Sequence, residues 1–140
     1  MLFPITDDRR PKTDHRQPRT AMQDYEKLDA WKMADELVLD VYRITAAFPS
    51  EERFGLAAHL RKTALSAPSN IAEGCGRYGS RELHNFLNIA CGSNSELEYQ
   101  LRLSHQLKYI SDEEHESLRT KTLRLRKMLH SLMNSVRDAG

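Results

Sequence analysis

The stretch "SAPSNIAEGCGR", residues 66–77, places small, polar and helix-breaking residues inside a segment that otherwise has the pattern of a long helix. Pro68 has no N–H to donate to the carbonyl oxygen of Ala64, so the sequence predicts a kink or break near Ala67. Small side chains allow two helix backbones to approach closely. We therefore interpret the stretch as a close helix–helix contact. Its polar members are expected to be buried together: Ser69, Asn70 and Glu73.

The segment that follows supplies the other side of this contact. The letters "GRYGS", residues 76–80, indicate a chain reversal, with Gly79 as the candidate for a left-handed backbone conformation. When two helices fold back about such a turn, residues at equal distances from it face each other. This places "ACGS", residues 90–93, against "ALSA", residues 64–67. Small residues therefore meet small residues in the predicted hairpin.

Composition and periodicity favour helices in the rest of the chain as well. Trp and Phe are few and Leu and Ala frequent, which is typical of packed helices rather than sheets. Apolar residues recur every three or four positions over residues 28–48 and predict the first helix. The charged residues between them are expected to face solvent: Lys32, Asp35, Glu36, Asp40 and Arg43. Pro49 ends this helix, and Ser50 is the predicted cap of the second.

Two further helices complete the predicted fold. The third covers residues 81–109, with Ser80 as its expected cap. Ser111 and Glu114 have the spacing of a capping box, so the fourth helix is expected to begin at Asp112. Four helices with short connections predict an all-α, up-down-up-down antiparallel four-helix bundle with a kinked second helix.

A chain of 140 residues suits one globular domain. We assign this domain to residues 23–140. Residues 1–22 are polar, contain three prolines and lack a helical period, which predicts a mobile N-terminal arm. The alternative is a mis-assigned start, with translation beginning at Met22. No apolar run reaches the roughly 18 residues of a membrane span, and no secretory signal is evident, so we expect a cytoplasmic protein.

Positive charge is concentrated in the predicted last helix, where residues 117–137 contain six basic and no acidic residues. Three arginines and one histidine fall on one line of this helix, at spacings of 7, 4 and 7, and are the candidate nucleic-acid-binding residues: Arg119, Arg126, His130 and Arg137. The alternative is that these side chains form ion pairs with residues 23–116 of the same chain or of a neighbouring chain, because this segment carries a net charge of −6. Leu123 lies beside this line and suggests a contact with another subunit.

Catalytic and metal-binding patterns are weak in this sequence. Asp112 with His115 only approximates a Glu-x-x-His motif, and two cysteines are too few for a thiolate site, so we expect no metal, no cofactor and no enzymatic activity. A ribonuclease of the HEPN type is a minor alternative. Its Arg-to-His spacing is matched by two pairs, Arg53 with His59 and Arg124 with His130. With fourteen Arg and six His in the chain, such pairs arise easily by chance.

The central stretch, together with "FPSEERFGL" (48–56), "FLNIACGSNSELEYQL" (86–101) and "KYIS" (108–111), resembles proteins encoded in intervening sequences of bacterial 23S ribosomal RNA genes. The resemblance covers the chain from about Tyr25 to its end. The motif residues, for which we expect a structural role, are Ser66, Pro68, Ser69, Asn70, Glu73, Gly74, Gly76 and Arg77. Ala67, Cys75 and Asn94 depart mildly from the family pattern.

This resemblance implies a small bundle that assembles into homopentameric rings and has no established enzymatic activity. A related branch, the accessory proteins of diversity-generating retroelements, binds nucleic acid and a reverse transcriptase. By analogy we expect a ring-forming homo-oligomer that binds RNA or DNA through the basic face of its last helix. The alternative function is that of a protein–protein adaptor or scaffold.

Overall fold

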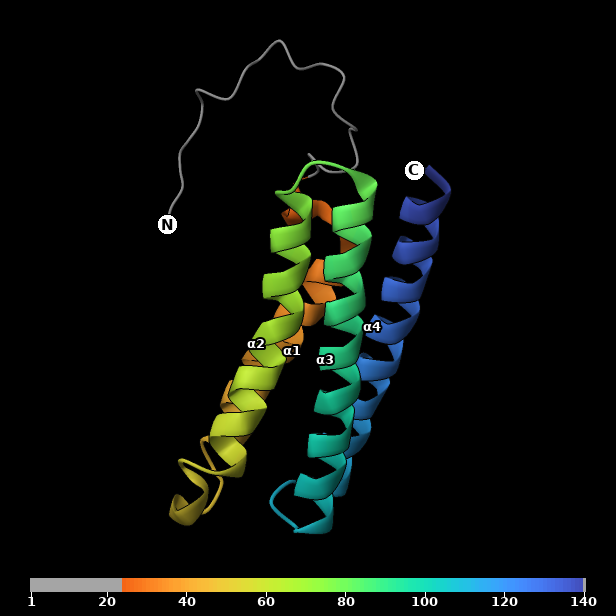
Figure 1. Ribbon diagram of the computed structural model, residues 1–140. Coiled ribbons are helices and arrows are strands. Elements are labelled where there is room, and N and C mark those ends of the chain that lie inside the picture. The colour runs from red at the N-terminus through yellow and green to blue at the C-terminus, as the bar shows by residue number, and fades with distance from the viewer. Residues whose placement is uncertain (1–23, 140) are drawn as a thin grey trace.

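The computed structural model describes residues 24–139 (Figure 1). Its four long helices are α1 (Asp29–Thr45), α2 (Leu56–Cys75), α3 (Ser80–Gln106) and α4 (Asp112–Ala139). Two short 3-10 helices, η3 (Tyr25–Lys27) and η4 (Ser50–Glu52), precede α1 and α2, and no strand occurs among residues 24–139. The predicted all-α class is confirmed. The predicted N-terminal arm lies outside the described residues.

The helices pack as a bundle in which α2 contacts α1 and α3, while α4 contacts α3 and α1. Figure 1 shows the α2–α3 connection and the C-terminal end of α4 at one end of the molecule, and the α3–α4 connection at the other. Helix α2 runs without interruption through Pro68, so the predicted alternative of a break is wrong. Burial of α2 between two neighbouring helices outweighs the loss of one backbone hydrogen bond. The kink stays a prediction.

Two predicted helix starts are wrong. Ser50 opens the 3-10 helix η4 and does not cap α2, which begins only at Leu56. The side chain of Glu52 performs that role, because its Oε1 accepts a hydrogen bond from the Leu56 N–H at 2.9 Å. Ser80 is the first residue of α3 rather than its cap. Gly79 is the cap and has a φ of 93°, a left-handed value that favours glycine, as expected.

The predicted start of α4 is confirmed. The Glu114 N–H donates to the Ser111 Oγ at 3.0 Å, and the Ser111 N–H donates to the Glu114 Oε1 at 2.8 Å. This reciprocal pair is the capping box expected from the sequence. Helix α3, which precedes α4 in the chain, ends at Gln106, three residues earlier than predicted.

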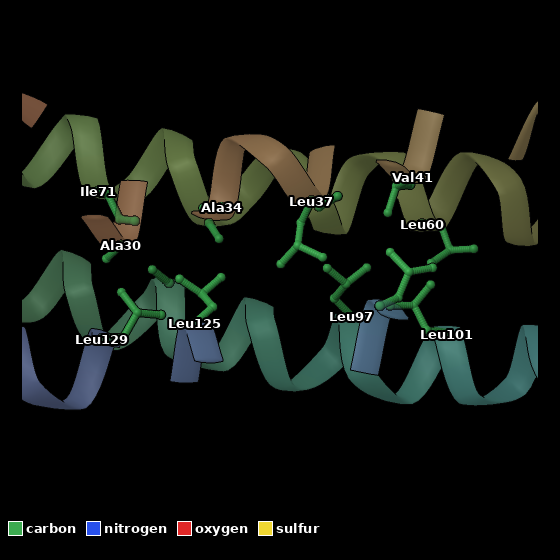
Figure 2. Packing of buried hydrophobic residues seen from close by; sticks show 14 of the residues in the cluster. Ala30, Ala34, Leu37, Val41, Leu60, Ile71, Leu97, Leu101, Leu125 and Leu129 are labelled. Carbon is green, nitrogen blue, oxygen red and sulfur yellow. The ribbon is translucent and has the colours of Figure 1, made fainter. Parts of the chain in front are cut away.

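The core lies along the axis of the bundle and receives side chains from all four helices (Figure 2). Its members include Leu37 and Val41 from α1, Leu60 and Ile71 from α2, Leu97 and Leu101 from α3, and Leu125 and Leu129 from α4. Each of these side chains is at least 98% buried. The apolar side chains of the four helices therefore meet in a single core.

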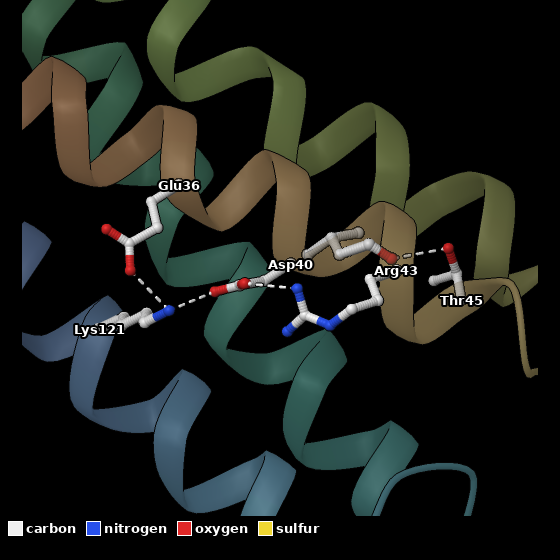
Figure 3. Close-up of polar contacts among 6 residues, drawn as sticks. Glu36, Asp40, Arg43, Thr45 and Lys121 are labelled. Atoms are coloured by element: carbon white, nitrogen blue, oxygen red, sulfur yellow. Dashed lines mark hydrogen bonds and ion pairs between the residues drawn. The ribbon is translucent and has the colours of Figure 1, made fainter.

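The expectation that Asp40 faces solvent is wrong. Asp40 is buried, with an exposed fraction of 6%, and its carboxylate accepts hydrogen bonds from Lys121 of α4 at 2.6 Å and from Arg43 at 3.0 Å (Figure 3). The Lys121 Nζ also contacts the Glu36 carboxylate at 2.7 Å. A carboxylate can occupy this position because α4 brings a compensating cation to it.

Candidate nucleic-acid interface

The central stretch of the sequence forms a close contact between α2 and α3. The Oγ atoms of Ser66 and Ser93 lie 2.6 Å apart across it. A Cβ atom added to Gly74 would lie 2.9 Å from side-chain atoms of both Leu83 and Phe86, closer than such atoms normally approach. Glycine at position 74 is therefore required by the neighbouring helix. Pro68 is buried in the same helix.

The expectation of a buried polar cluster in this stretch is wrong. Ser69 and Glu73 are exposed and Asn70 is only half-buried, because these positions fall on the outer face of α2. Asn70 Nδ2 donates within its own helix to the Ser66 carbonyl oxygen at 2.8 Å. Glu73 pairs with Arg77 at 2.7 Å. The motif thus combines a buried contact face with an exposed polar face.

Gly76 is exposed beyond the end of α2, and the Arg77 guanidinium lies 5.1 Å from the centre of the Phe86 ring on α3. This cation–π contact and the Glu73 ion pair hold the Arg77 side chain against the end of the hairpin.

The four predicted nucleic-acid-binding residues of α4 have different surroundings. Arg126 is half-buried and pairs with Glu98 of α3. Arg137 is exposed and lies 3.7 Å from Asp138. Arg119 and His130 are exposed, and neither has an acidic partner within 4 Å among the described residues. Within the single chain, the ion-pair alternative therefore applies to Arg126 and not to Arg119 or His130.

Other cations complete the outer face of α4. Arg124 and Lys127 are exposed and, within residues 24–139, have no acidic partner within 4 Å. We define the basic face of α4 as Arg119, Arg124, Lys127, His130 and Arg137. Lys121 does not belong to it, because it is turned toward α1 (Figure 3). Burial acts to lower the pKa of Lys121, but hydrogen bonds to Asp40 and Glu36 outweigh burial and raise it above its usual value.

A groove of about 230 Å³ runs between α3 and α4 beside the basic face. We define this α3–α4 groove by Glu98, Tyr99, Arg102, His115 and Arg119. Only Arg119 was selected from the sequence. The other four were missed because the sequence pattern of one helix does not show which residues of a second helix lie beside it.

Two histidines stack at the α3–α4 connection next to this groove. The ring centres of His105 and His115 are 4.3 Å apart, and the rings are inclined by 18°. His105 Nε2 lies 2.7 Å from the Asp112 carboxylate, and this hydrogen bond lowers the pKa of Asp112. Burial, His105 and Arg119 lower the pKa of His115, so its imidazole is neutral at neutral pH.

The described part of the chain contains no cluster of three or more His, Cys, Asp or Glu side chains arranged to hold a metal ion. None of the described helices is long and apolar enough to cross a membrane. Both members of each HEPN-like pair are exposed, Arg53 with His59 and Arg124 with His130. The guanidinium of Arg53 lies over the ring of Phe54, 5.5 Å from its centre.

Four packed helices, a tight α2–α3 hairpin and a basic outer face on α4 define a small all-α helical-bundle protein. Within this class, the family model described as 23S rRNA-intervening sequence protein matches residues 26–131. The chain belongs to this family. The resemblance recognised in the central stretch is therefore confirmed.

A solved structure of similar fold is that of a protein of unknown function from the S23 ribosomal protein family of Bacteroides thetaiotaomicron VPI-5482. The match has a TM-score of 0.69 and 24% sequence identity, and it covers 75% of this chain and 95% of that one. At this identity the match supports the fold alone. No curated protein matches the chain.

Proposed function

We propose that the protein is a non-enzymatic, self-associating helical bundle that binds nucleic acid, RNA in particular, through the basic face of α4. The observation that carries this proposal is the row of exposed basic side chains beyond the first turns of α4. Three of them, Arg119, Arg124 and Lys127, are cations with no acidic partner within 4 Å among the described residues. Phosphates placed along such a row release counterions when they are neutralised, which favours binding.

The distribution of apolar residues supports a division of roles between the helices. Among the described residues, the large apolar and aromatic side chains that are exposed lie on α1, α2, α3 and the connections, and none lies on α4. Among the most exposed are Leu39 of α1, Phe54 of the α1–α2 connection and Ile89 of α3. Surfaces of this kind suit contacts between subunits, which leaves the basic face of α4 accessible.

Self-association would strengthen a weak nucleic-acid contact. A ring of subunits, such as the homopentamer that the family resemblance implies, presents several copies of the basic face to one strand. Binding by linked sites then raises the apparent affinity without any new contact.

The test is fluorescence anisotropy of a labelled RNA of about 30 nucleotides, long enough to contact several binding sites. With three to five cations neutralising one phosphate each, the logarithm of affinity should fall against the logarithm of salt concentration with a slope of about −2 to −4. The double variant Arg119→Glu/Lys127→Glu should weaken binding by at least about tenfold. The matched control is Lys32→Glu/Lys62→Glu, which reverses two exposed charges on α1 and α2.

Wild-type protein that shows no salt-dependent affinity for RNA would overturn the proposal. Arg126 is unsuitable for this test, because Arg126→Glu would place two carboxylates against each other at Glu98 and disturb the α3–α4 contact.

The second candidate function is a protein–protein adaptor or scaffold, and Phe54 is the observation that favours it. Its side chain is 86% exposed on a short connection. Such a residue suits insertion into a pocket of a partner. An assembly that forms normally but ignores RNA and DNA would support this function instead.

A further inference from the structure

We propose that the α3–α4 groove binds one nucleotide of a single-stranded nucleic acid, with the Tyr99 ring stacking on the base and the guanidinium groups of Arg102 and Arg119 binding the adjacent phosphate. This inference rests on the proposed function and specifies the form of nucleic acid recognised. It also gives residues of α3 a role in binding, in addition to the basic face of α4.

The shape of the groove suits part of a strand. Its volume of about 230 Å³ is below the roughly 300–1,000 Å³ of pockets that enclose a whole small-molecule ligand. Tyr99 lines the groove and is 56% exposed, so one aromatic surface is available to a ligand. A single base or phosphate fits such a site while the rest of the strand continues over the surface.

The charges in the groove favour a phosphate. Arg102 and Arg119 come from different helices, and neither has an acidic partner within 4 Å in residues 24–139. The groove also contains the carboxylate of Glu98, but Arg126 neutralises it through an ion pair. A guanidinium presents two parallel N–H groups that match two phosphate oxygens. His115 is neutral at neutral pH and retains a ring N–H that can donate.

Tyr99 is the residue that separates single strands from duplexes. In a duplex the base faces are covered by their neighbours, so a surface tyrosine reaches only sugar and phosphate. An unpaired base has a free face, and aromatic side chains bind it with little dependence on sequence. A binding site composed of cations alone would not make this distinction.

The experiment measures anisotropy of a labelled oligouridylate of about 12 nucleotides, within the site sizes of single-strand binders, and of a duplex RNA of the same length. The expected result is tighter binding of the single strand. Tyr99→Ala should weaken single-strand binding by about tenfold and leave duplex binding unchanged, while Tyr99→Phe retains the wild-type affinity. Arg102→Ala should weaken single-strand binding as well.

The matched control is Tyr42→Ala, which removes an exposed tyrosine from α1. It should leave binding of both ligands unchanged. Thermal melts of each variant verify that the bundle is folded, and light scattering verifies that Tyr42→Ala, on the α1 surface proposed for subunit contacts, keeps the mass of the wild-type assembly. Unlabelled uridine monophosphate distinguishes a strand from a free nucleotide, and the expected result is no competition at a molar excess of about 100-fold over the oligonucleotide.

The outcomes separate this inference from the proposed function. Equal binding of single strand and duplex, with no effect of Tyr99→Ala, would overturn the groove assignment while leaving binding by the basic face of α4 intact. Effective competition by uridine monophosphate would overturn the assignment to a strand. Absence of any RNA binding would overturn both proposals.

Discussion

Two glycines on neighbouring helices have opposite structural requirements. Gly74 on α2 faces α3, where an added Cβ would lie 2.9 Å from two side-chain atoms. Gly92 on α3 faces open space, with no atom within 4 Å of an added Cβ. The residue type is the same, but only the first position needs it for packing.

We predict that Gly74→Ala destabilises the protein by about 1–3 kcal/mol, because overpacking exceeds the gain in helix propensity. Gly92→Ala, as the matched control, should stabilise it by about 0.5–1 kcal/mol, because α3 then loses a flexible interior residue. Urea unfolding measures both free energies. Equal stabilisation by the two substitutions would show that α2 and α3 are not in close contact at Gly74.

A second comparison at the residue scale concerns the two carboxylates that form ion pairs with Lys121, those of Asp40 and Glu36. Asp40→Asn should lower the free energy of unfolding by about 1–3 kcal/mol, because it removes the charge from a buried carboxylate that accepts two hydrogen bonds. Glu36→Gln should lower it by less than about 1 kcal/mol, because the Glu36 side chain is half exposed and its ion pair is screened by water. Chemical denaturation of both variants checks the order. A larger effect at Glu36 would contradict the burial of Asp40.

At the scale of elements, three titratable side chains meet where α3 is joined to α4. The side chains of Asp112 and His105 form a hydrogen bond across this connection. The ring of His115, in the first turn of α4, stacks on the ring of His105. Burial, His105 and Arg119 disfavour a charge on His115, whereas Glu116 and Asp112 favour one more weakly. Protonation of His115 therefore opposes the folded arrangement.

This arrangement predicts the pH dependence of stability. The pKa of His115 in the folded state is below its ordinary value of 6.5, so the unfolded chain binds more protons near that pH. His115 therefore contributes a loss of stability as the pH falls from about 7 toward 5. Thermal melts across this range should show a smaller decrease for His115→Gln than for wild type. The control is His59→Gln, which makes the same change on the exposed face of α2. If the melting temperature of the His115→Gln variant decreased with falling pH as steeply as that of the wild type, the prediction would be contradicted.

At the scale of the whole molecule, basic and apolar surfaces lie on different helices. Leu39 of α1 and Ile89 of α3 suit subunit contacts, and the basic face of α4 suits phosphates. Leu123, which the sequence placed beside the predicted nucleic-acid-binding residues as a subunit contact, is half-buried in the single chain. Other apolar residues are therefore better candidates for the contact between subunits.

We predict that light scattering at micromolar concentration and moderate salt gives a mass several times the 16.2 kDa of one chain. Leu39→Glu or Ile89→Glu should reduce this mass, because each places a charge on an exposed apolar position of the proposed contact surface. Lys127→Glu, on the basic face of α4, should leave the mass unchanged. A 16.2 kDa monomer in the wild-type protein would contradict the prediction.

The sequence by itself determined the features that depend on neighbours within one helical turn. Apolar spacing specified the first helix, Ser111 and Glu114 specified the start of α4, and Gly79 specified the reversal before α3. These signals are local, because capping, turn conformation and amphipathic spacing act between residues a few positions apart. The central stretch was also long enough to identify the family.

Only the tertiary structure decided which side chains meet between helices. Lys121 neutralises Asp40 across 81 positions and Arg126 neutralises Glu98 across 28, so one residue assigned to solvent became buried and one assigned to nucleic acid became part of the bundle. The groove formed by Tyr99 and Arg102 with Arg119 arises in the same way. Helical periodicity fixes the face on which a residue lies, but the rotation and register of the packed helices fix its partner.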